Sequence, residues 1–581
     1  MKQLGFASGL GALLLATVFA ASPALAAPPV LRDTTIVVDG NLFFNNDGGN
    51  FNVASGGALC PGGTYTTTQL ATVKFKNVIG VDPKINPQVF TLGNPRWNPL
   101  DGSPVLAGNG ADVLNAASLD PYFVNVPYLG AVPYTGGIDA NDWTTGWTYY
   151  NTQGGLGRAD IDTTKTAVVL TTAITADTTW HNNTNIVLQG RIQVNPPHVL
   201  TIEPGTVVMA TGVGSYLVIP RGSQIQAVGT RNAPIIFTSG RRWQEGKQAA
   251  GDWGGVVLHG RAWANCVGGC GLTNTGDCAS EGDQIGGVPQ PWGGQEDTDS
   301  KGHIEYCRLE YSGFTVSLNN ELNAWTQNGV GTGTIFQYNE ACWCTDDGFE
   351  WFGGTVNERY LVAAYNADDN FDWQMGYRGL VQFGVSVQAS AALTPGLDKA
   401  IEADNNEFGF NCPLRSDPFF ANMTLVGTGS LSGGGAGINL RRGTAGKIIN
   451  SVIMGFSGAG LSIQDVATFD QCAGDTVPSQ PPAVLGVGDS PLGGRQLIVR
   501  AAPNPTAGSA NLSFSLSQSE NVRIQVFSVT GRLVDTLQDG SMPAGDHMVK
   551  WTPKETAPGI YFYSVVTDSG AKAHGKLVVA R

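Results

Sequence analysis

Two short stretches of the sequence repeat the same acids at the same spacing. Residues 345–351 read TDDGFEW and residues 367–373 read ADDNFDW, so each acid of the first stretch has a counterpart at the same place in the second. Carboxylates repeated in this way could hold a hard cation such as calcium, which takes roughly six to eight oxygen ligands. The candidate metal ligands are Asp346, Asp347, Glu350, Asp368, Asp369 and Asp372.

A 22-residue repeat fits one coil of a parallel β-solenoid, in which residues one coil apart lie over each other at roughly 4.8 Å. Phe349 is then expected to stack on Phe371 and Trp351 on Trp373 inside the solenoid, with the acids outside. Unit charges about 4 Å apart repel by about 4 kcal/mol at an effective dielectric near 20. Half-buried acids would therefore require a cation, whereas solvated acids could serve as turn residues whose side chains bond the backbone.

A third stretch, EADNNEF at residues 402–408, offers Glu402, Asp404 and Asn405. The three stretches leave two interpretations open, a calcium site or a set of turn hydrogen bonds.

The same acids also allow two kinds of enzyme. A polysaccharide lyase needs a calcium ion to neutralise a uronate and a base such as arginine, for which Arg378, Arg441 and Arg442 are candidates. A glycoside hydrolase needs two carboxylates roughly 5 to 10 Å apart, to which Asp346 and Asp347 could contribute. With six histidines and no HExxH or Ser-His-Asp pattern, zinc peptidases and hydrolytic triads have no support. The sequence favours a protein that is not an enzyme, with a lyase or hydrolase of acidic glycans as the alternative.

A binding module for extracellular polysaccharide requires exposed aromatic rings near the acids. The candidates for stacking on sugars are Trp253, Trp292, Trp343 and Trp373. For each of them taken singly, the sequence favours a core aromatic or a cap at the end of a coil.

The N-terminus predicts export. Lys2, the apolar run at residues 10–21 and the small residues Ala24 and Ala26 are typical of a signal peptide, cleaved after residue 26. The sequence has no later stretch of roughly 20 apolar residues that would predict a transmembrane helix. The net charge of −14 disfavours nucleic acid as a partner. We expect an extracellular or outer-surface location.

Composition predicts an all-β protein, because only 14% of the residues are charged and 79 are glycine. Apolar runs recur roughly every 20 to 25 residues in the central part of the chain, which indicates a solenoid. The expected organisation is a signal peptide (1–26), an irregular β-rich region that flanks or caps the solenoid (27–154), a parallel β-helix (155–471), a linker (472–494) and a C-terminal domain (495–581).

Several stretches of the central part resemble a family of exported bacterial right-handed parallel β-helix proteins of largely unknown function. They include LTIEPGTVV (200–208), GDWGGVVLHG (251–260) and, as the most specific, DDGFEWFGGTV (346–356). The resemblance covers about residues 170–465 and implies a fold and an extracellular location rather than an activity. Residues 120–150 resemble a piece that relatives carry after the helix, although here it comes before.

The C-terminal part resembles the small Ig-like domain of type IX secretion sorting domains and of flagellar hook-capping proteins. The resemblance rests on PNPTAGSANLSFSL (503–516), VRIQVFSVTGRLVDTL (522–537) and PGIYFYSVV (558–566). About seven strands in about 87 residues fit a β-sandwich. The resemblance implies that the export machinery is a partner and that Lys576, Leu577 and Val578 belong to the sorting signal.

Nine cysteines in an exported chain predict disulfides, with an odd one left over. Cys266, Cys270 and Cys278 lie in one glycine-rich loop and are expected to staple it. Cys342 and Cys344 face the same side of a strand, and one of them could reach Cys307 in a neighbouring strand.

Together these features predict a secreted or cell-surface β-helix protein, a calcium-stabilised binding, adhesive or structural module delivered by a C-terminal sorting domain.

Overall fold

The computed structural model describes residues 36–44, 46, 51–53, 77–86, 96–110, 112–136, 142–149, 161–212, 214–245, 247–274, 276–279, 282–285, 287–317, 320–389, 399–428, 435–469, 499–502, 506, 508–516, 518–528, 533–553, 559–568 and 572–579. The chain divides into two compact units, Met1–Val484 and Leu485–Arg581. The predicted signal peptide with Ala24 and Ala26, and the predicted linker 472–494, lie outside the described residues.

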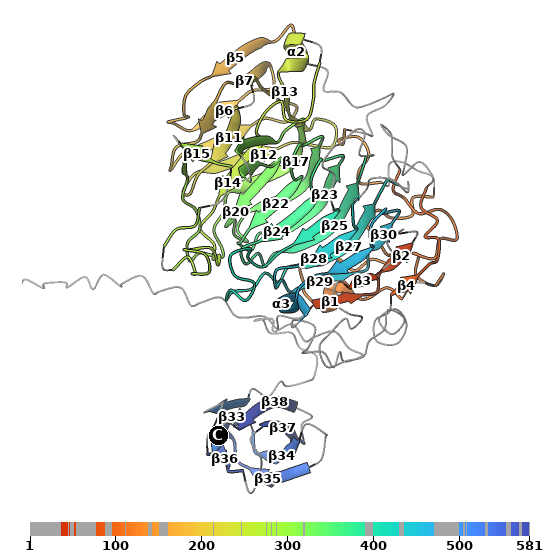
Figure 1. The fold of residues 1–581 in the computed structure, drawn as a ribbon, viewed down its shortest axis with the longest axis vertical. Coiled ribbons are helices and arrows are strands. Elements are labelled where there is room, and N and C mark those ends of the chain that lie inside the picture. Colours follow the sequence, from red (N-terminus) through yellow and green to blue (C-terminus); the bar gives the residue numbers. More distant parts are fainter. Residues whose placement is uncertain are drawn as a thin grey trace, which may run out of the picture. The chain divides into compact units, whose positions relative to one another are not determined.

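The first unit is a solenoid of parallel strands (Figure 1), which confirms the predicted β-helix. One wall is a 17-stranded sheet. Five of its strands are long, and each of them spans two sides of its own coil: β17 (Gly302–Glu310), β21 (Ile335–Cys342), β23 (Glu358–Ala364), β25 (Leu380–Val387) and β27 (Phe419–Val426). Its shorter strands are β1 (Ile36–Asp39), β2 (Leu42–Phe44), β4 (Val78–Ile79), β5 (Thr166–Leu170), β6 (Thr178–Trp180), β7 (Thr184–Leu188), β9 (Val199–Ile202), β10 (Val207–Ala210), β12 (Gln224–Val228), β13 (Ile235–Ser239), β29 (Gly446–Ile449) and β30 (Val452–Met454).

The facing wall is a ten-stranded parallel sheet that carries the repeated acids. In spatial order its strands are β8 (Arg191–Gln193), β11 (Tyr216–Ile219), β14 (Val256–His259), β20 (Trp325–Asn328), β22 (Phe349–Phe352), β24 (Phe371–Gln374), β26 (Ile401–Ala403), β28 (Ile438–Leu440), β31 (Leu461–Ile463) and β3 (Phe51–Val53). Apolar side chains from both walls fill one continuous core between them.

Minor elements decorate the solenoid. They are the hairpins β15 (Gln284–Ile285) with β16 (Val288–Pro289) and β18 (Phe314–Ser317) with β19 (Asn320–Leu322), and the short helices η2 (Ala116–Ser118), α2 (Arg241–Glu245) and α3 (Val466–Phe469).

The long strands bend at one residue that adopts a positive φ angle, which costs roughly 1 to 2 kcal/mol for a residue with a side chain. The bend residue is Tyr306, Tyr338, Tyr360 and Phe383 in four successive coils. Their rings stack in a column with centroids 4.5, 4.3 and 5.0 Å apart. Ring stacking of this kind contributes about 0.5 to 1.5 kcal/mol per pair and so offsets the strained backbone.

The N-terminal residues form the last coil of the solenoid. Strands β1, β2 and β3 pair in parallel with β29, β30 and β31, which are the last strands of the central part of the chain. Gly40, with a φ of 64°, occupies the bend of this coil. Part of the range predicted as an irregular flank is thus a regular coil, whose partners come from the far end of the solenoid sequence.

A return segment (residues 112–136 and 142–149) connects this last coil with the first and lies on the outside of the 17-stranded sheet. Three solenoid side chains donate hydrogen bonds to its carbonyls: Asn450 to Leu114 (2.7 Å), Gln382 to Val124 (2.7 Å) and Arg231 to Thr145 (2.6 Å). Trp143 and Trp147 pack edge-on against the aromatic column. The segment that resembles a C-terminal piece of relatives therefore flanks the solenoid along its length.

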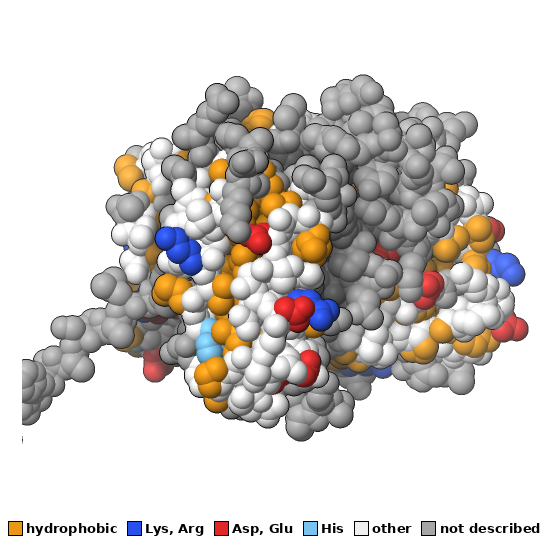
Figure 2. All heavy atoms as spheres, turned by 90° about the horizontal axis from the view of Figure 1, so that it is seen from below, with side chains coloured by type: hydrophobic (Ala, Val, Ile, Leu, Met, Phe, Trp, Pro, Cys, Tyr) orange, Lys and Arg blue, Asp and Glu red, His pale blue; other side chains and the backbone are white. Residues whose placement is uncertain are grey.

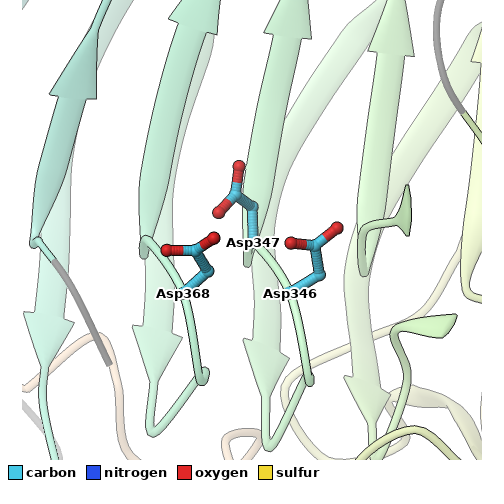
Figure 3. Close-up of side chains that lie close together, drawn as sticks. All are labelled: Asp346, Asp347 and Asp368. Carbon is cyan, nitrogen blue, oxygen red and sulfur yellow. The ribbon is translucent and has the colours of Figure 1, made fainter. Parts of the chain in front are cut away.

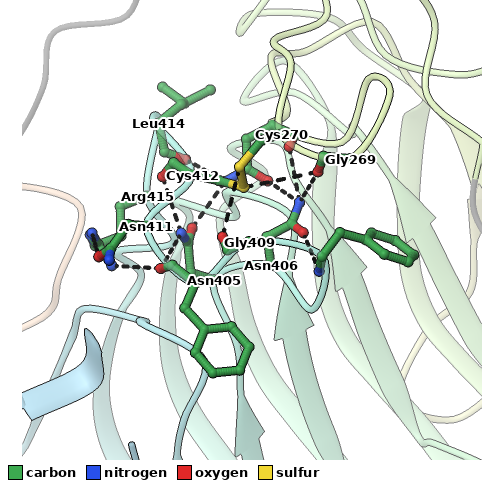
Figure 4. Close-up of a disulfide and its surroundings, with 12 residues drawn as sticks. Gly269, Cys270, Asn405, Asn406, Gly409, Asn411, Cys412, Leu414 and Arg415 are labelled. Atoms are coloured by element: carbon green, nitrogen blue, oxygen red, sulfur yellow. Dashed lines mark hydrogen bonds between the residues drawn. A yellow bond between two sulfur atoms is a disulfide. The ribbon is translucent and has the colours of Figure 1, made fainter. Parts of the chain in front are cut away.

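Two disulfides lie in a lobe on the solenoid formed by residues 265–274, 276–279 and 405–415, which we call the disulfide lobe. Figure 4 shows the one between Cys270 and Cys412. Cys266 bonds Cys278 within the glycine-rich loop, as predicted, but Cys270 bonds Cys412, 142 residues away. The suggested bond from Cys342 or Cys344 to Cys307 is wrong, because all three are free and buried. Cys307 lies opposite Asn339 in the sheet, which puts Cys342 about 10 Å further along its strand.

The described residues of the second unit form seven antiparallel strands in two sheets. One sheet is β32 (Val499–Ala502), β33 (Ala510–Leu516) and β36 (Gly545–Trp551), and the other is β35 (Leu533–Met542), β34 (Glu520–Ser528), β37 (Gly559–Thr567) and β38 (Lys572–Val579). Side chains from both sheets form one core that includes Val522, Ile524 and Val526. The Ig-like label for this unit stays a prediction.

Among the described residues, no helix is long and apolar enough to cross a membrane. In the described part of the face shown in Figure 2, charged side chains lie singly or in small groups among hydrophobic and other side chains, in keeping with the low charged content of the chain.

A buried carboxyl group joins the return segment to the solenoid and makes stability depend on pH. Glu340 accepts a hydrogen bond from the backbone N–H of Tyr149 (2.8 Å) and lies opposite Arg308 in the sheet. Burial raises the pKa of Glu340 to about 8, with Arg308 opposing the rise and Glu310 adding to it. The folded protein therefore keeps a proton that the unfolded chain releases from about pH 4.5 upward.

We expect Glu340→Gln to become progressively more stable than the parent protein as pH rises from 5 to 8, with the difference constant above about pH 9. Gln keeps the acceptor for Tyr149 but cannot ionise, so it avoids the loss of stability that the carboxylate causes in this window. Thermal unfolding at a series of pH values measures the difference. Glu296→Gln, at a side chain with 58% exposure, serves as the control and should follow the parent. A parallel pH profile for Glu340→Gln and the parent would contradict the prediction.

Candidate functional site

The two acidic stretches lie directly over each other in the ten-stranded sheet. Phe349 pairs with Phe371, Glu350 with Asp372 and Trp351 with Trp373, which confirms the predicted 22-residue register. The aromatic side chains point into the core and are fully buried. The acids point outward but are also buried, with exposed fractions of 2% for Glu350 and 7% for Asp372.

The repeat of the acids has a structural cause in the turn before each strand. The Asn323 side chain accepts a hydrogen bond from the backbone N–H of Asp347 (3.2 Å), one coil further on. In the same way, Asp347 accepts from Asp369 N–H (2.9 Å) and Asp369 accepts from Lys399 N–H (2.6 Å). Each turn side chain therefore binds the backbone of the next coil, and a short side chain with an oxygen acceptor is needed at this position in every coil.

The remaining acids add charge that these hydrogen bonds do not require. We call Asp346, Asp347, Glu350, Asp368, Asp369, Asp372 and Glu402 the acid row. Glu402 belongs to it because it pairs with Asp372 in the next strand of the sheet.

Within the acid row, three sets of carboxylates each have oxygen atoms within 4.8 Å of one another. The first group is Asp346, Asp347 and Asp368 (Figure 3), from the turns of two neighbouring coils. The second group is Asp347, Glu350 and Asp372, and the third group is Asp369, Asp372 and Glu402. A hard cation placed in any group would meet three carboxylates from at least two coils.

Burial and mutual repulsion hold protons on these groups in the absence of a cation. Burial raises the pKa of Asp347 well above its usual range, and the charges of Asp346, Glu350, Asp372 and Asp369 raise it further. The pKa values of Asp369 and Asp372 are raised for the same reasons, although Lys399 lowers both. A bound cation or a positively charged side chain would therefore stabilise the ionised acid row.

Asp372 is the member with the poorest compensation. Among the described residues, its Oδ1 atom is buried and has no hydrogen-bond partner. Two neighbouring oxygens on the outer face of the sheet, Gln374 Oε1 and Asn439 Oδ1, are also buried without a hydrogen-bond partner in the described part of the chain. A buried acceptor without a partner costs about 1 to 3 kcal/mol, more when it is charged. All three atoms are acceptors, which suits a cation rather than an anion.

The end of the row at Glu402 is compensated by side chains of the protein itself. Lys399 Nζ lies 2.7 Å from Glu402 Oε1, and Arg441 contacts the other oxygen of Glu402. Arg441 Nε also lies 2.8 Å from Asp404 Oδ1, and Arg442 Nη1 lies 2.8 Å from Asp404 Oδ2. Burial nevertheless raises the pKa of Asp404 to about 7.

Of the arginines proposed for catalysis, the structure brings only Arg441 and Arg442 to the acids. Asp368 and Asp369 lie before the first residue of β24, and Arg378 lies after its last residue. The length of the strand therefore separates Arg378 from the two acids by about 10 Å or more. Arg378 pairs instead with Asp297 (3.1 Å). The grouping of Arg378 with Asp346 and Asp347 is therefore wrong, and Arg441, engaged by two carboxylates, lacks the free position of a base.

Three of the four tryptophans proposed for sugar stacking are inside the protein. Trp253, Trp292 and Trp373 have exposed fractions of 1%, 0% and 0%, because they fill the solenoid core or the space beneath the disulfide lobe. Only Trp343 is half-buried, beside Tyr365 with ring centroids 5.0 Å apart.

Several residues of the site were not identified from the sequence. Asn323, Gln374 and Lys399 line the acid row, and only their position one coil from an acid could have indicated it. Asn405, grouped with the acids on sequence, instead anchors the disulfide lobe by donating to the carbonyls of Phe410 and Cys412 (both 3.1 Å). In the second unit, Lys576, Leu577 and Val578 are part of β38, and Leu577 is buried in its core.

Two substitutions of Asp347 distinguish the effect of its hydrogen bond on stability from the effect of its ionisable carboxyl group. With calcium removed by a chelator, we expect Asp347→Ala to lower the free energy of unfolding by about 1 to 3 kcal/mol, because Asp369 N–H is left buried without a partner. Asp347→Asn keeps an acceptor and cannot ionise beside the other acids, so it should be at least as stable as the parent. Urea unfolding of the two variants measures this, and equal destabilisation by both would contradict the role of the turn hydrogen bond.

Comparison with known proteins agrees with this architecture. A family described as "Pectate-lyase like beta helix domain" matches residues 172–483, and a family described as "Secretion system C-terminal sorting domain" matches residues 501–580. No curated protein matches the chain. Among solved structures, the enzymatically active domain of tailspike protein 2 of bacteriophage CBA120 is 8% identical, with 67% of this chain and 72% of that chain covered, but its TM-score of 0.15 carries no argument.

The sorting domain places the protein at the cell surface or in the extracellular space, as expected from the sequence. The β-helix match spans more than half of the chain and coincides with the solenoid that carries the acid row. The chain therefore belongs to the family of proteins with a pectate-lyase-like β-helix domain.

Proposed function

We propose that the protein is a surface module whose β-helix is stabilised by calcium bound in the acid row, and that it binds extracellular polysaccharide rather than cleaving it. The observation that carries the calcium part is Asp372, a buried carboxylate with an oxygen that has no hydrogen-bond partner among the described residues, between two groups of further carboxylates.

The burial of the acid row favours a stabilising ion over a catalytic one. Glu350, Asp347, Asp369 and Asp372 are all buried, with exposed fractions of 2% to 7%. An ion held by them would join neighbouring coils and relieve the repulsion between stacked acids. An ion that activates a substrate needs open coordination positions, and only Asp346 and Asp368 are half-buried rather than buried.

The polysaccharide part rests on aromatic side chains at the surface. Trp343 is half-buried, and so are the column residues Tyr306, Tyr338 and Tyr360 with Trp143 beside them. These rings are held rigidly by stacking, so contact with a sugar would order few additional side chains.

Calcium is expected to raise the thermal stability of the purified protein relative to chelator. For one site, free calcium at 100 times its dissociation constant would add about 2.7 kcal/mol to the free energy of unfolding. Asp372→Asn should lose most of this gain because it removes a charge shared by two groups of the row. Asp277→Asn, at an acid with 51% exposure in the disulfide lobe, should keep it. Absence of a calcium effect on the parent, or an undiminished effect on Asp372→Asn, would overturn the calcium proposal.

Incubation with uronic-acid and neutral polysaccharides, followed by size-exclusion chromatography of protein and polymer, tests the binding proposal. We expect intact polymer to co-elute with the protein, and Trp343→Ala to weaken this co-elution. Tyr134→Ala removes another exposed aromatic ring (43% exposed) and serves as the matched control. Polymer shortened only in the presence of calcium would replace the proposal with a lyase or hydrolase. No co-elution would leave a structural surface protein.

A further inference from the structure

The acid row is compensated differently at its two ends. Within the described part of the chain, Asp347, Asp368, Asp369 and Asp372 make no ion pair with Lys, Arg or His, whereas Glu402 contacts both Lys399 and Arg441. At the third group, therefore, the protein supplies two cations of its own, Lys399 and Arg441.

Arg441 contacts one carboxylate of the third group, Glu402, and its positive charge also interacts with Asp372 and Asp369. Its guanidinium contacts Glu402 Oε2 through Nη2, and it binds Asp404 through Nε and Nη2 at 2.8 and 3.2 Å. Because the planar guanidinium donates to two carboxylates at once, it is fixed in position rather than free to swing away. Only 23% of its side chain is exposed.

Sequence position explains why this cation stands at this end of the row. Asp404 follows β26 and Arg441 follows β28, so they extend neighbouring strands, and Arg441 donates its backbone N–H to the carbonyl of Ala403 (2.9 Å). In the register of the sheet, this position is taken by Gln374 in the coil of β24 and by Phe352 in the coil of β22, and neither side chain is charged. At this register position, the described coils of β22 and β24 thus carry no positive charge, in contrast to the coil of β28 with Arg441.

We propose that Arg441 is a resident cation that occupies the third group of the acid row and thereby limits calcium to the first and second groups. Arg441 sets how many ions the row takes up, because the guanidinium supplies the charge that a further calcium ion would bring to Asp372 and Glu402. The inference rests on the proposed calcium site for the first two groups, but its statement about the third group can be tested separately.

The experiment counts the calcium ions bound by the full chain, by calorimetric titration and by elemental analysis after dialysis. We expect Arg441→Gln to bind one more calcium ion per chain than the parent. Arg441→Lys, which keeps a positive charge, should bind the same number as the parent. Arg442→Gln is the matched control, because the Arg442 guanidinium contacts Asp404 (2.8 Å) and Glu407 (3.8 Å), which lie outside the third group.

The outcomes distinguish this inference from the proposed function. An equal number of ions in the parent and in Arg441→Gln would overturn the role of Arg441 and leave the calcium site in place. No ion in the parent but one in Arg441→Gln would overturn the calcium site of the parent and support the role of Arg441. No ion in either protein would overturn both. If Arg441→Gln is unstable in chelator, recovery of its thermal stability in calcium, by a larger increment than the parent shows, would support the inference, and lack of recovery would contradict it.

Discussion

Parallel stacking of successive coils is the constraint on which the rest of this structure depends. Strands lie about 4.8 Å apart, so a residue is held against its counterpart in the coils before and after it. For apolar side chains this is favourable, and Phe349 on Phe371 or Trp351 on Trp373 builds the core with no further requirement. For acids it is unfavourable, since like charges directly opposite one another repel. Every acid in the stack therefore has to be protonated, paired or bound to a cation.

The regular part of the solenoid could be predicted because its repeat is local. The constant spacing between matched aromatic and acidic residues is visible in the sequence and fixes the register of β22 on β24. The last coil could not be predicted in this way, because Ile36–Asp39 and Phe51–Val53 share no motif with the strands they extend. Their partners are β29 and β31, at the opposite end of the solenoid sequence, and nothing in a single sequence reports such a pairing. The return segment is a consequence of it, since the chain must run back along the solenoid before the first coil begins.

The acid row was predictable by position but not by environment. Sequence spacing assigned Asp346 to Asp372 to one face, but whether that face was buried depended on side chains from other coils, such as Asn323 and Gln374. The tryptophans show the same limit. Trp253 and Trp373 are of the residue type that binds sugars at surfaces, but the structure places both in the core. The cations at Glu402 were hidden by a longer coil, because the interval from Phe371 to its partner Ile401 exceeds that from Phe349 to Phe371 and displaces Lys399 and Arg441 from the visible repeat.

A second set of buried charges shows that this chain can compensate acids by register when no ion is involved. On the 17-stranded wall, Arg308 lies directly opposite Glu340 of the next coil and 2.6 Å from Glu310 on its own strand, so one arginine lies beside two buried acids. Glu350 and Asp372 are opposite each other on the ten-stranded wall with no arginine between them, and the next position brings Glu402. Stacking therefore does not force acids to lie on acids, because a single arginine in the repeat would place a positive charge beside an acid, as Arg308 does. The acids kept at this position include Asp372, whose buried Oδ1 has no hydrogen-bond donor among the described residues, and such an arrangement is stabilised by a divalent cation. At Glu402 the protein supplies positive charge of its own through Lys399 and Arg441.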